Sequence, residues 1–263
     1  MEKEGRDKEA LDLAVKAGQI LLDAGAEIYR VEETVQRIAR AYGIRKCNTF
    51  GLSTGIFVTA EMEDHSIYAQ VKHIPLNAAR LNRVAAVNQL SREIEEGKHT
   101  IEDARNQLAA IEHMPGKRDI TRIFASGLGS AGFCYVLEGT IADTTAAFFA
   151  GLFVYVLLIL LEKRKKQTSK IVLNIIGGFW AALLTMIFFR IGIGQNYESI
   201  LVGTLMPLVP GVSFVNAIRD FADADYIGGA VRLLDALLVA LGISLGVGLM
   251  YMLYYRITGG MLL

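Results

Sequence analysis

The chain has 263 residues, of which 52% are hydrophobic, and its 27 lysines and arginines balance 27 aspartates and glutamates. A net charge of zero lacks the strongly basic balance that is typical of nucleic-acid binding, so we expect no nucleic-acid partner. The charge is unevenly spread, because residues 1–122 hold 18 of the 27 basic and 19 of the 27 acidic side chains. This distribution predicts a cytosolic α+β domain over 1–122 and an α-helical transmembrane domain over 123–263.

Four helices are predicted in the amino-terminal domain. Apolar residues recur at helical spacing over 8–24 and 27–42, and the same periodicity returns over 76–96 and 100–112. Thr100 stands directly before the last of these stretches, where a hydroxyl side chain typically caps a helix.

A small sheet is predicted between the two pairs of helices. The β-rich segment CNTFGLSTGIFVTA (47–60) and the alternating segment SIYAQVKHI (66–74) are separated by a turn-like stretch. Alternation places Ile67, Ala69 and Val71 on one face of the second segment. The pattern indicates a hairpin.

Polar side chains of this domain leave a second class of function open, a membrane-anchored hydrolase or ligand-sensing protein. The candidate residues are Thr49, Ser53, Thr54, Thr59, His65, His73, Glu32, Glu33 and Asp64. They form no GxSxG turn, Walker loop or HExxH motif, so surface residues of a structural domain are the simpler interpretation. Cys47 and Cys134 belong to no CxxC or Cys/His spacing, and we expect no catalytic residue, metal, cofactor or disulfide.

The second half contains about five apolar runs close to the roughly 20 residues that a helix needs to cross a bilayer. They cover 123–141, 144–161, 170–189, 200–218 and 229–255. The charged start of the chain lacks the apolar core of a signal peptide. We therefore expect a multi-pass protein of the cell (inner) membrane.

Basic residues near the ends of the runs predict the orientation, because short loops rich in lysine and arginine stay in the cytoplasm. The loop between the second and third runs carries Lys163, Arg164, Lys165, Lys166 and Lys170. We expect a cytoplasmic amino terminus and a carboxyl terminus outside. Glu138 and Asp143 then flank an outer turn and are expected to be solvated.

The fourth run is interrupted by the stretch PLVPGVSFVNAIRD (207–220). Each proline removes a backbone donor and clashes with the preceding turn, so the helix is predicted to break. At membrane depth such breaks typically line a substrate site, whereas the simpler alternative is a kink that only shapes packing. The predicted substrate-binding residues are Pro207, Pro210, Gly211, Ser213 and Asn216.

Ionisable residues follow the break, and charge near a bilayer is usually paired or functional. Arg219, Asp220, Asp223 and Asp225 are the predicted coupling or gating residues. An aspartate at a water-filled cavity binds and releases a proton, whereas the competing interpretation is an Arg-Asp network that only anchors the loop.

Three stretches resemble the threonine/serine exporter (ThrE) family: AGAEIYRVEETVQRIARAYG (24–43), STGIFVT (53–59) and PGVSFVNAIRDFADADYIGG (210–229). The resemblance implies a transporter rather than an enzyme. Full-length members of the family carry about twice as many spans. Five spans therefore resemble the split form, in which a YjjP-type longer subunit works with a short YjjB-type membrane subunit, a pair associated with succinate export.

The resemblance and the broken run together predict one subunit of a secondary exporter, driven by the proton gradient. The expected substrates are small carboxylate-bearing metabolites, either threonine and serine or a dicarboxylate such as succinate. The expected partner is the YjjB-type subunit or further copies of this chain. Small residues on the first and fifth runs, Gly127 and Ser130 and then Gly242 and Gly246, predict tight helix contacts within the chain or with that neighbour.

Overall fold

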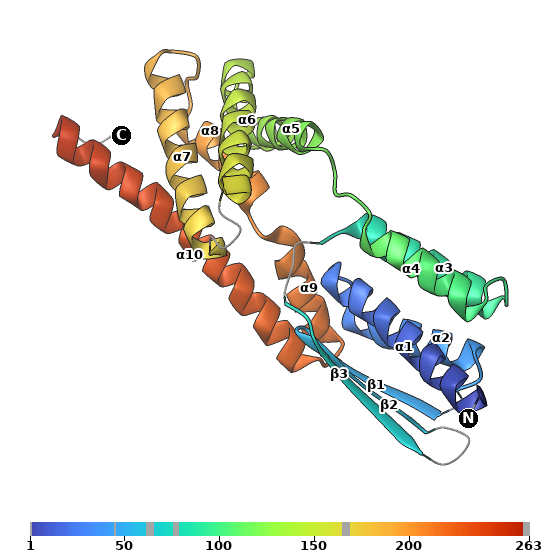
Figure 1. Ribbon diagram of the computed structural model, residues 1–263. Coiled ribbons are helices and arrows are strands. Elements are labelled where there is room, and N and C mark those ends of the chain that lie inside the picture. Colours follow the sequence, from blue (N-terminus) through green and yellow to red (C-terminus); the bar gives the residue numbers. More distant parts are fainter. Residues whose placement is uncertain (1, 45, 62–65, 76–78, 165–168, 260–263) are drawn as a thin grey trace. The chain divides into compact units, whose positions relative to one another are not determined.

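The structure is a computed structural model that describes residues 2–44, 46–61, 66–75, 79–164 and 169–259 (Figure 1). The chain divides into two compact units. Unit 1 comprises Met1–Gly116 together with Asn216–Arg232, and unit 2 comprises Lys117–Val215 together with Leu233–Leu263. The segment after the predicted break thus packs with the amino-terminal residues, although it lies a hundred residues further along the chain.

Unit 1 has four helices from its amino-terminal part. These are α1 (Glu2–Asp23), α2 (Ile28–Ala41), α3 (Leu81–Glu95) and α4 (Ile101–Glu112). Their apolar stripes form one core with the inner face of the sheet, and Leu11, Ile38 and Leu108 are among its fully buried side chains. The four predicted helices are present.

The sheet has three antiparallel strands, β1 (Lys46–Leu52), β2 (Gly55–Glu61) and β3 (Ile67–His73), in the order β1-β2-β3. Alternation buries Ile56 and Val58 of β2 against the helices. The opposite face carries the cross-strand row Phe50, Phe57 and Val71, which is exposed. The β-rich stretch contains two strands where the sequence pattern suggested one arm of a hairpin, because the turn at Ser53–Thr54 divides it.

Unit 2 is helical. Its elements are α5 (Asp119–Val136), α6 (Ile141–Arg164), α7 (Lys170–Arg190), α8 (Tyr197–Leu205), the 3-10 turn η1 (Met206–Leu208), the start of α9 (Gly211–Ala222) and most of α10 (Tyr226–Thr258). Helix α10 has 33 residues and is about 50 Å long at 1.5 Å per residue. This length exceeds the thickness of the hydrocarbon core of a bilayer, which is roughly 30 Å. The first turns of α10 can therefore lie outside the core, and residues up to Arg232 belong to unit 1.

Three of the described helices, α6, α7 and α10, are long and apolar enough to cross a membrane. A fourth span is possible by length and composition if the bent pair Tyr197–Leu208 and Gly211–Ala222 counts as one. Helix α5 is not among them, since its 18 residues include Asp119, Arg122 and two serines. The structure therefore supports a membrane protein with three or four apolar spans, and five spans stay a prediction.

Small residues bring the helices of unit 2 together. Ser126 of α5 donates a hydrogen bond to the carbonyl oxygen of Gly151 in α6, at 3.2 Å. A Cβ added at Gly203 of α8 would lie 2.7 Å from Cβ of Cys134, and one at Gly246 of α10 would overlap the carbonyl oxygen of Ile175 in α7. The small-residue faces of α5 and α10 are thus used for contacts inside the chain.

Candidate functional site

The helix break lies where the two prolines predict it. Helix α8 tightens into η1, Val209 is extended at ψ 131°, and α9 restarts at Gly211 with a bend of 64°. Proline restricts the residue before it to extended conformations, which explains why Val209 ends the first segment before Pro210. The carbonyl of Pro210 then accepts the first bond of α9 from Phe214, at 3.0 Å. The fourth apolar run therefore forms two helices that meet at this bend.

The turn between α9 and α10 positions the acidic residues. Ala224 has a left-handed backbone at φ +63°, and the amides of Ala224 and Asp225 donate to the carbonyls of Phe221 and Asp220 at 3.2 and 2.8 Å. This is a Schellman motif, which closes the end of α9. Asp225 then caps α10, because its Oδ1 accepts a bond from the amide of Gly228 at 2.9 Å.

Two ion pairs and a hydrogen bond hold this turn against other residues of unit 1. Asp220 and Arg232 are only 5% and 6% exposed, and Oδ2 of the first lies 3.3 Å from Nε of the second. The guanidinium of Arg232 also donates to the carbonyl of Ala26, at 3.2 Å. Arg219 forms an ion pair with Glu27. The structure therefore contains the anchoring Arg-Asp network that the sequence left as one of two interpretations.

Two glycines allow this close approach. A Cβ on Gly228 would lie 2.9 Å from Cδ1 of Ile28 in α2, and a Cβ on Gly229 would lie 2.8 Å from the ring of Phe221 in α9. Ser53, a buried residue of the β1–β2 turn, donates to the carbonyl of Gly228 at 3.2 Å. Both glycines keep the first turn of α10 close to its neighbours.

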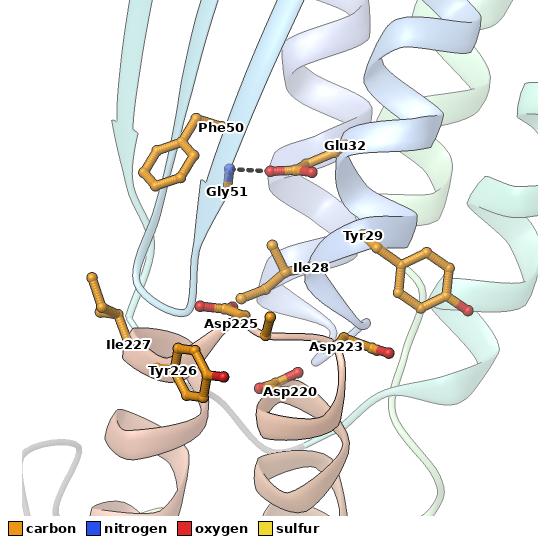
Figure 2. Close-up of a pocket in the computed structure, with 11 residues that line it drawn as sticks. Ile28, Tyr29, Glu32, Phe50, Gly51, Asp220, Asp223, Asp225, Tyr226 and Ile227 are labelled. Atoms are coloured by element: carbon orange, nitrogen blue, oxygen red, sulfur yellow. Dashed lines mark hydrogen bonds between the residues drawn. The ribbon is translucent and has the colours of Figure 1, made fainter.

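A pocket of about 420 Å³ opens between this turn, α2 and β1 (Figure 2). The lining residues are Ile28, Tyr29, Glu32, Phe50, Gly51, Asp220, Asp223, Ala224, Asp225, Tyr226 and Ile227. Glu32 is held in place because its Oε1 accepts a bond from the amide of Gly51, at 2.7 Å. We call this pocket the acidic pocket.

The predicted site residues fall into two groups. Asp220, Asp223 and Asp225 meet in the acidic pocket, and Arg219 lies beside them in its ion pair. The other group comprises Pro207, Pro210, Gly211, Ser213 and Asn216, which lie at the break and on the first turns of α9. The sequence did not predict that Tyr29, Phe50 and Tyr226 also line this pocket. No pattern in a single sequence indicates which residues so far apart lie together in the fold.

Asp143 departs from its sequence-based interpretation. It was expected to be a solvated loop acid, but it is 0% exposed. Its carboxylate accepts bonds from the amide and hydroxyl of Thr140, at 2.9 and 2.7 Å, and from the amides of Gln195 and Asn196, at 2.6 and 2.9 Å. The buried charge is thus satisfied by four donors, and it ties the start of α6 to the loop before α8.

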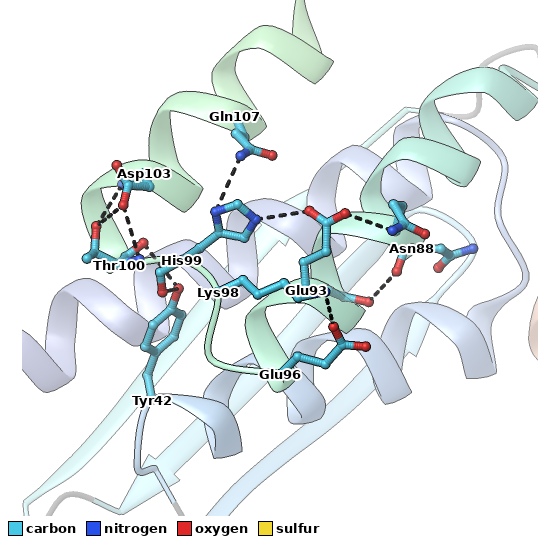
Figure 3. Close-up of polar contacts among 11 residues, drawn as sticks. Tyr42, Asn88, Glu93, Glu96, Lys98, His99, Thr100, Asp103 and Gln107 are labelled. Carbon is cyan, nitrogen blue, oxygen red and sulfur yellow. Dashed lines mark hydrogen bonds and ion pairs between the residues drawn. The ribbon is translucent and has the colours of Figure 1, made fainter.

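Each ring nitrogen of His99 lies within hydrogen-bond distance of another side chain (Figure 3). Its Nε2 lies 2.9 Å from Oε2 of Glu93, and its Nδ1 lies 3.4 Å from Nε2 of Gln107. Hydrogen bonds from Gln89 and from His99 lower the pKa of the Glu93 carboxyl. Both ring nitrogens face structural partners, so this group joins α3 to α4 and does not resemble a nucleophile and base. His65 lies outside the described residues.

The expected cap at Thr100 is confirmed as a capping box (Figure 3). The amide of Asp103 donates to the hydroxyl of Thr100 at 3.2 Å, and the Asp103 carboxylate accepts from the Thr100 amide at 3.3 Å.

We expect Thr100→Ala to lower the free energy of unfolding by about 1 kcal/mol, whereas Thr100→Ser keeps the hydroxyl and stays near wild type. Thermal unfolding of the full chain in detergent measures both, and equal stabilities of the two variants would contradict the role of the hydroxyl.

The long apolar helices indicate a helical membrane protein, and helix breaks like the one at Pro207 and Pro210 occur in secondary transporters. The sequence model of the threonine/serine exporter family (ThrE) matches residues 12–254. The chain belongs to this family.

Two curated relatives carry the same name. The "Threonine/serine exporter" of Corynebacterium glutamicum is 24% identical over 250 residues, which cover 91% of this chain and 50% of that protein. The "Probable threonine/serine exporter" of Mycobacterium tuberculosis is 22% identical over 243 residues, which cover 91% of this chain and 45% of that protein. The chain thus spans about half the length of the relatives it matches. No solved structure matches it.

Proposed function

We propose that this chain is one half of a secondary exporter for small carboxylate-bearing metabolites. Membership of the exporter family supports transport in general, and the names of the two relatives suggest threonine and serine as substrates. A dicarboxylate such as succinate is the alternative substrate. The observation that carries the proposal is the break of an apolar span between η1 and α9.

The break supplies groups that suit a carboxylate. The first amides of a helix have no acceptor inside the helix, and the helix dipole adds partial positive charge at that end. In α9 these are the amides of Val212 and Ser213, because the amide of Gly211 already donates to the carbonyl of Val209 at 2.8 Å. A substrate carboxylate at this end would accept hydrogen bonds from these two amides. The side chains of Ser213 and Asn216 lie within the first two turns of the same helix.

Coupling to the proton gradient is assigned to Asp220, with Arg219, Asp223 and Asp225 around it. Its carboxylate is buried and faces Arg232, and protonation would release that ion pair. Release would free α9 to move relative to α10, which links a proton to the position of the half-helix that carries the substrate.

A second membrane half is proposed to come from outside residues 1–263. Secondary transporters of this kind commonly enclose the substrate between two structurally repeated halves. The two relatives are about twice as long as the region they share with this chain. The second half would be a short YjjB-type membrane subunit or another copy of this chain.

Reconstitution into liposomes tests the proposal. We expect efflux of labelled threonine, serine or succinate to depend on an imposed proton gradient, and to rise when the chain is purified together with the second membrane half. A chain that binds none of these compounds and moves none of them in either preparation would refute an exporter of this substrate class.

Replacing Gly211 with leucine tests the break directly. A Cβ added at Gly211 meets no described atom within 4 Å, and neither does one at Gly132 in α5. We expect Gly211→Leu to lower efflux at least about tenfold, because it fills the space at the start of α9, while the matched variant Gly132→Leu keeps wild-type flux. Both proteins should be present in the membrane in equal amounts. Equal flux from the two variants would remove the break from the substrate path.

A further inference from the structure

We propose that the free edge of strand β3 pairs with β3 of a second copy of this chain, antiparallel and about a two-fold axis at Val71. The pairing joins two three-stranded sheets into one continuous sheet. This inference goes beyond the proposed export function, since it concerns a contact of unit 1 with another copy of unit 1. It holds whichever substrate is moved and whatever supplies the second membrane half.

The two edges of the sheet differ in how they are covered (Figure 1). At the β1 edge, the amide of Gly51 donates to Oε1 of Glu32 in α2, at 2.7 Å. At the β3 edge, no strand of the described residues pairs with β3 on its outer side, and Ala69, Val71 and His73 are exposed. An uncovered edge offers a row of amides and carbonyls to another strand.

The hydrogen bonds to β2 show which groups of β3 point away from the sheet. The amide of Ile74 donates to the carbonyl of Thr54 at 2.9 Å, and the register of β2 and β3 continues from there without a bulge. Successive residues of an antiparallel strand bond to opposite sides, so every second residue counted back from Ile74 bonds to β2. The amides and carbonyls of Ala69, Val71 and His73 therefore point to the free edge, where no described residue bonds to them.

Strand β3 lacks most of the features that commonly prevent such pairing. Its sequence between Ile67 and His73 has no proline, and its ladder with β2 has no bulge. Its one charged side chain, Lys72, is exposed and has no ion-pair partner among the residues that the structure describes. The strand is therefore free to accept a neighbour, and Lys72 helps to decide which neighbour fits.

The apolar row on the outer face of the sheet points to a second copy of this chain. Phe50, Phe57 and Val71 stand side by side on β1, β2 and β3, and they are 58%, 42% and 64% exposed. When Val71 lies opposite the partner's Val71, this row continues directly into the partner's Phe57 and Phe50. Apolar cross-strand neighbours on one face stabilise a sheet, and a two-fold axis makes the same patch complementary to itself.

The same register brings together two charges that have no ion-pair partner in the described parts of the chain. It places Lys72 opposite the partner's Gln70, whose amide donates to Oδ1 of Asp12 in α1. Asp12 is exposed, so Lys72 of one copy can reach Asp12 of the other, and symmetry forms this pair twice. The two neighbouring registers set Lys72 against the partner's Tyr68 or against the partner's Lys72. Charge complementarity thus favours the register centred on Val71.

Cysteine substitutions of the full chain in its membrane test this register. Opposite residues of a hydrogen-bonded antiparallel pair have Cα atoms about 5.5 Å apart, which suits a disulfide. We therefore expect Val71→Cys to form a linked dimer on oxidation with copper phenanthroline, as seen on a non-reducing gel. Both native cysteines, Cys47 and Cys134, are buried, so the unsubstituted chain should stay unlinked.

Ala69→Cys is the matched control, because it lies on the same strand and the same face and is also exposed. In the proposed register its two copies lie roughly 14 Å apart, beyond the reach of a disulfide. We expect its linked fraction to be lower than that of Val71→Cys by about tenfold. Equal linking of the two variants, or no linking of Val71→Cys above the unsubstituted chain, would overturn the pairing.

A charge exchange tests the choice of a second copy. Lys72→Glu sets a carboxylate against the partner's Asp12 at two symmetric places, so we expect self-association of the purified chain, measured by light scattering in detergent, to weaken about tenfold. Adding Asp12→Lys to Lys72→Glu restores opposite charges and should restore the dimer. A double variant that stays as weak as Lys72→Glu, or a dimer that neither change affects, would refute the contact.

A strand from a different protein is the competing occupant of this edge. In that case the purified chain is monomeric and Val71→Cys stays unlinked, and this result also refutes the self-pairing. None of these measurements depends on flux, so a chain that exports but shows no β3 pairing refutes this inference alone. A chain that pairs through β3 but moves no substrate bears only on the export proposal.

Discussion

Replacing Gly246 with leucine is expected to destabilise unit 2 by about 3 kcal/mol. A Cβ at this position would overlap the carbonyl oxygen of Ile175 and lie 2.7 Å from the amide nitrogen of Phe179. Both obstacles are backbone atoms of α7, which cannot rotate away as a flexible side chain would. Helices α7 and α10 would have to separate, and the melting temperature in detergent should fall by roughly 6 to 12 °C.

A matched control lies two residues further along the same helix. A Cβ at Gly248 meets no described atom within 4 Å, so Gly248→Leu adds the same side chain to α10 without a clash. We expect that variant to melt within about 2 °C of the wild type. Similar melting temperatures for the two variants would show that α10 does not pack on α7 through Gly246.

The second large effect is expected from Asp220→Ala. This change leaves the guanidinium of Arg232 buried without its counter-charge, and breaking a buried ion pair in this way costs about 3 to 5 kcal/mol. Asp223→Ala is the control, because Asp223 lies on the same turn but is exposed, and its effect should stay within about 0.5 kcal/mol. Equal melting temperatures for these two variants would contradict the anchoring of the turn.

A double variant separates loss of the pair from the unpaired charge. Asp220→Ala with Arg232→Leu removes both charges, so we expect the double variant to be more stable than Asp220→Ala alone.

The Asp220→Asn variant distinguishes a residue that only anchors the turn from one that carries the coupled proton. If Asp220 carries the proton, the asparagine variant should lose gradient-driven efflux and keep substrate exchange, because exchange need not change its protonation. Unchanged dependence of flux on pH would remove Asp220 from the coupling step.

Much of the local structure was predictable because it depends on neighbouring residues. Pro207 and Pro210 break the fourth apolar run, since the missing donor and the restricted residue before each proline act within one turn. Thr100 starts α4 for an equally local reason, a hydroxyl within reach of the amide three residues on. The amino-terminal helices and the three long apolar helices α6, α7 and α10 follow from periodicity and run length in the same way.

The tertiary structure alone decided where the polar residues end up. Asp220, Asp223 and Asp225 share a pocket with Glu32 and Phe50, which lie about 170 to 190 positions earlier in the sequence. Asp143 is buried because amides some 50 residues away converge on it. Local propensity specifies each helix and its ends, but burial and pairing depend on which elements pack together, and that choice follows from the summed contacts of the whole chain. The sequence by itself therefore determined a membrane protein with an apolar run that breaks at two prolines, and only the packed fold assembled an acidic pocket from α2, β1 and the α9–α10 turn.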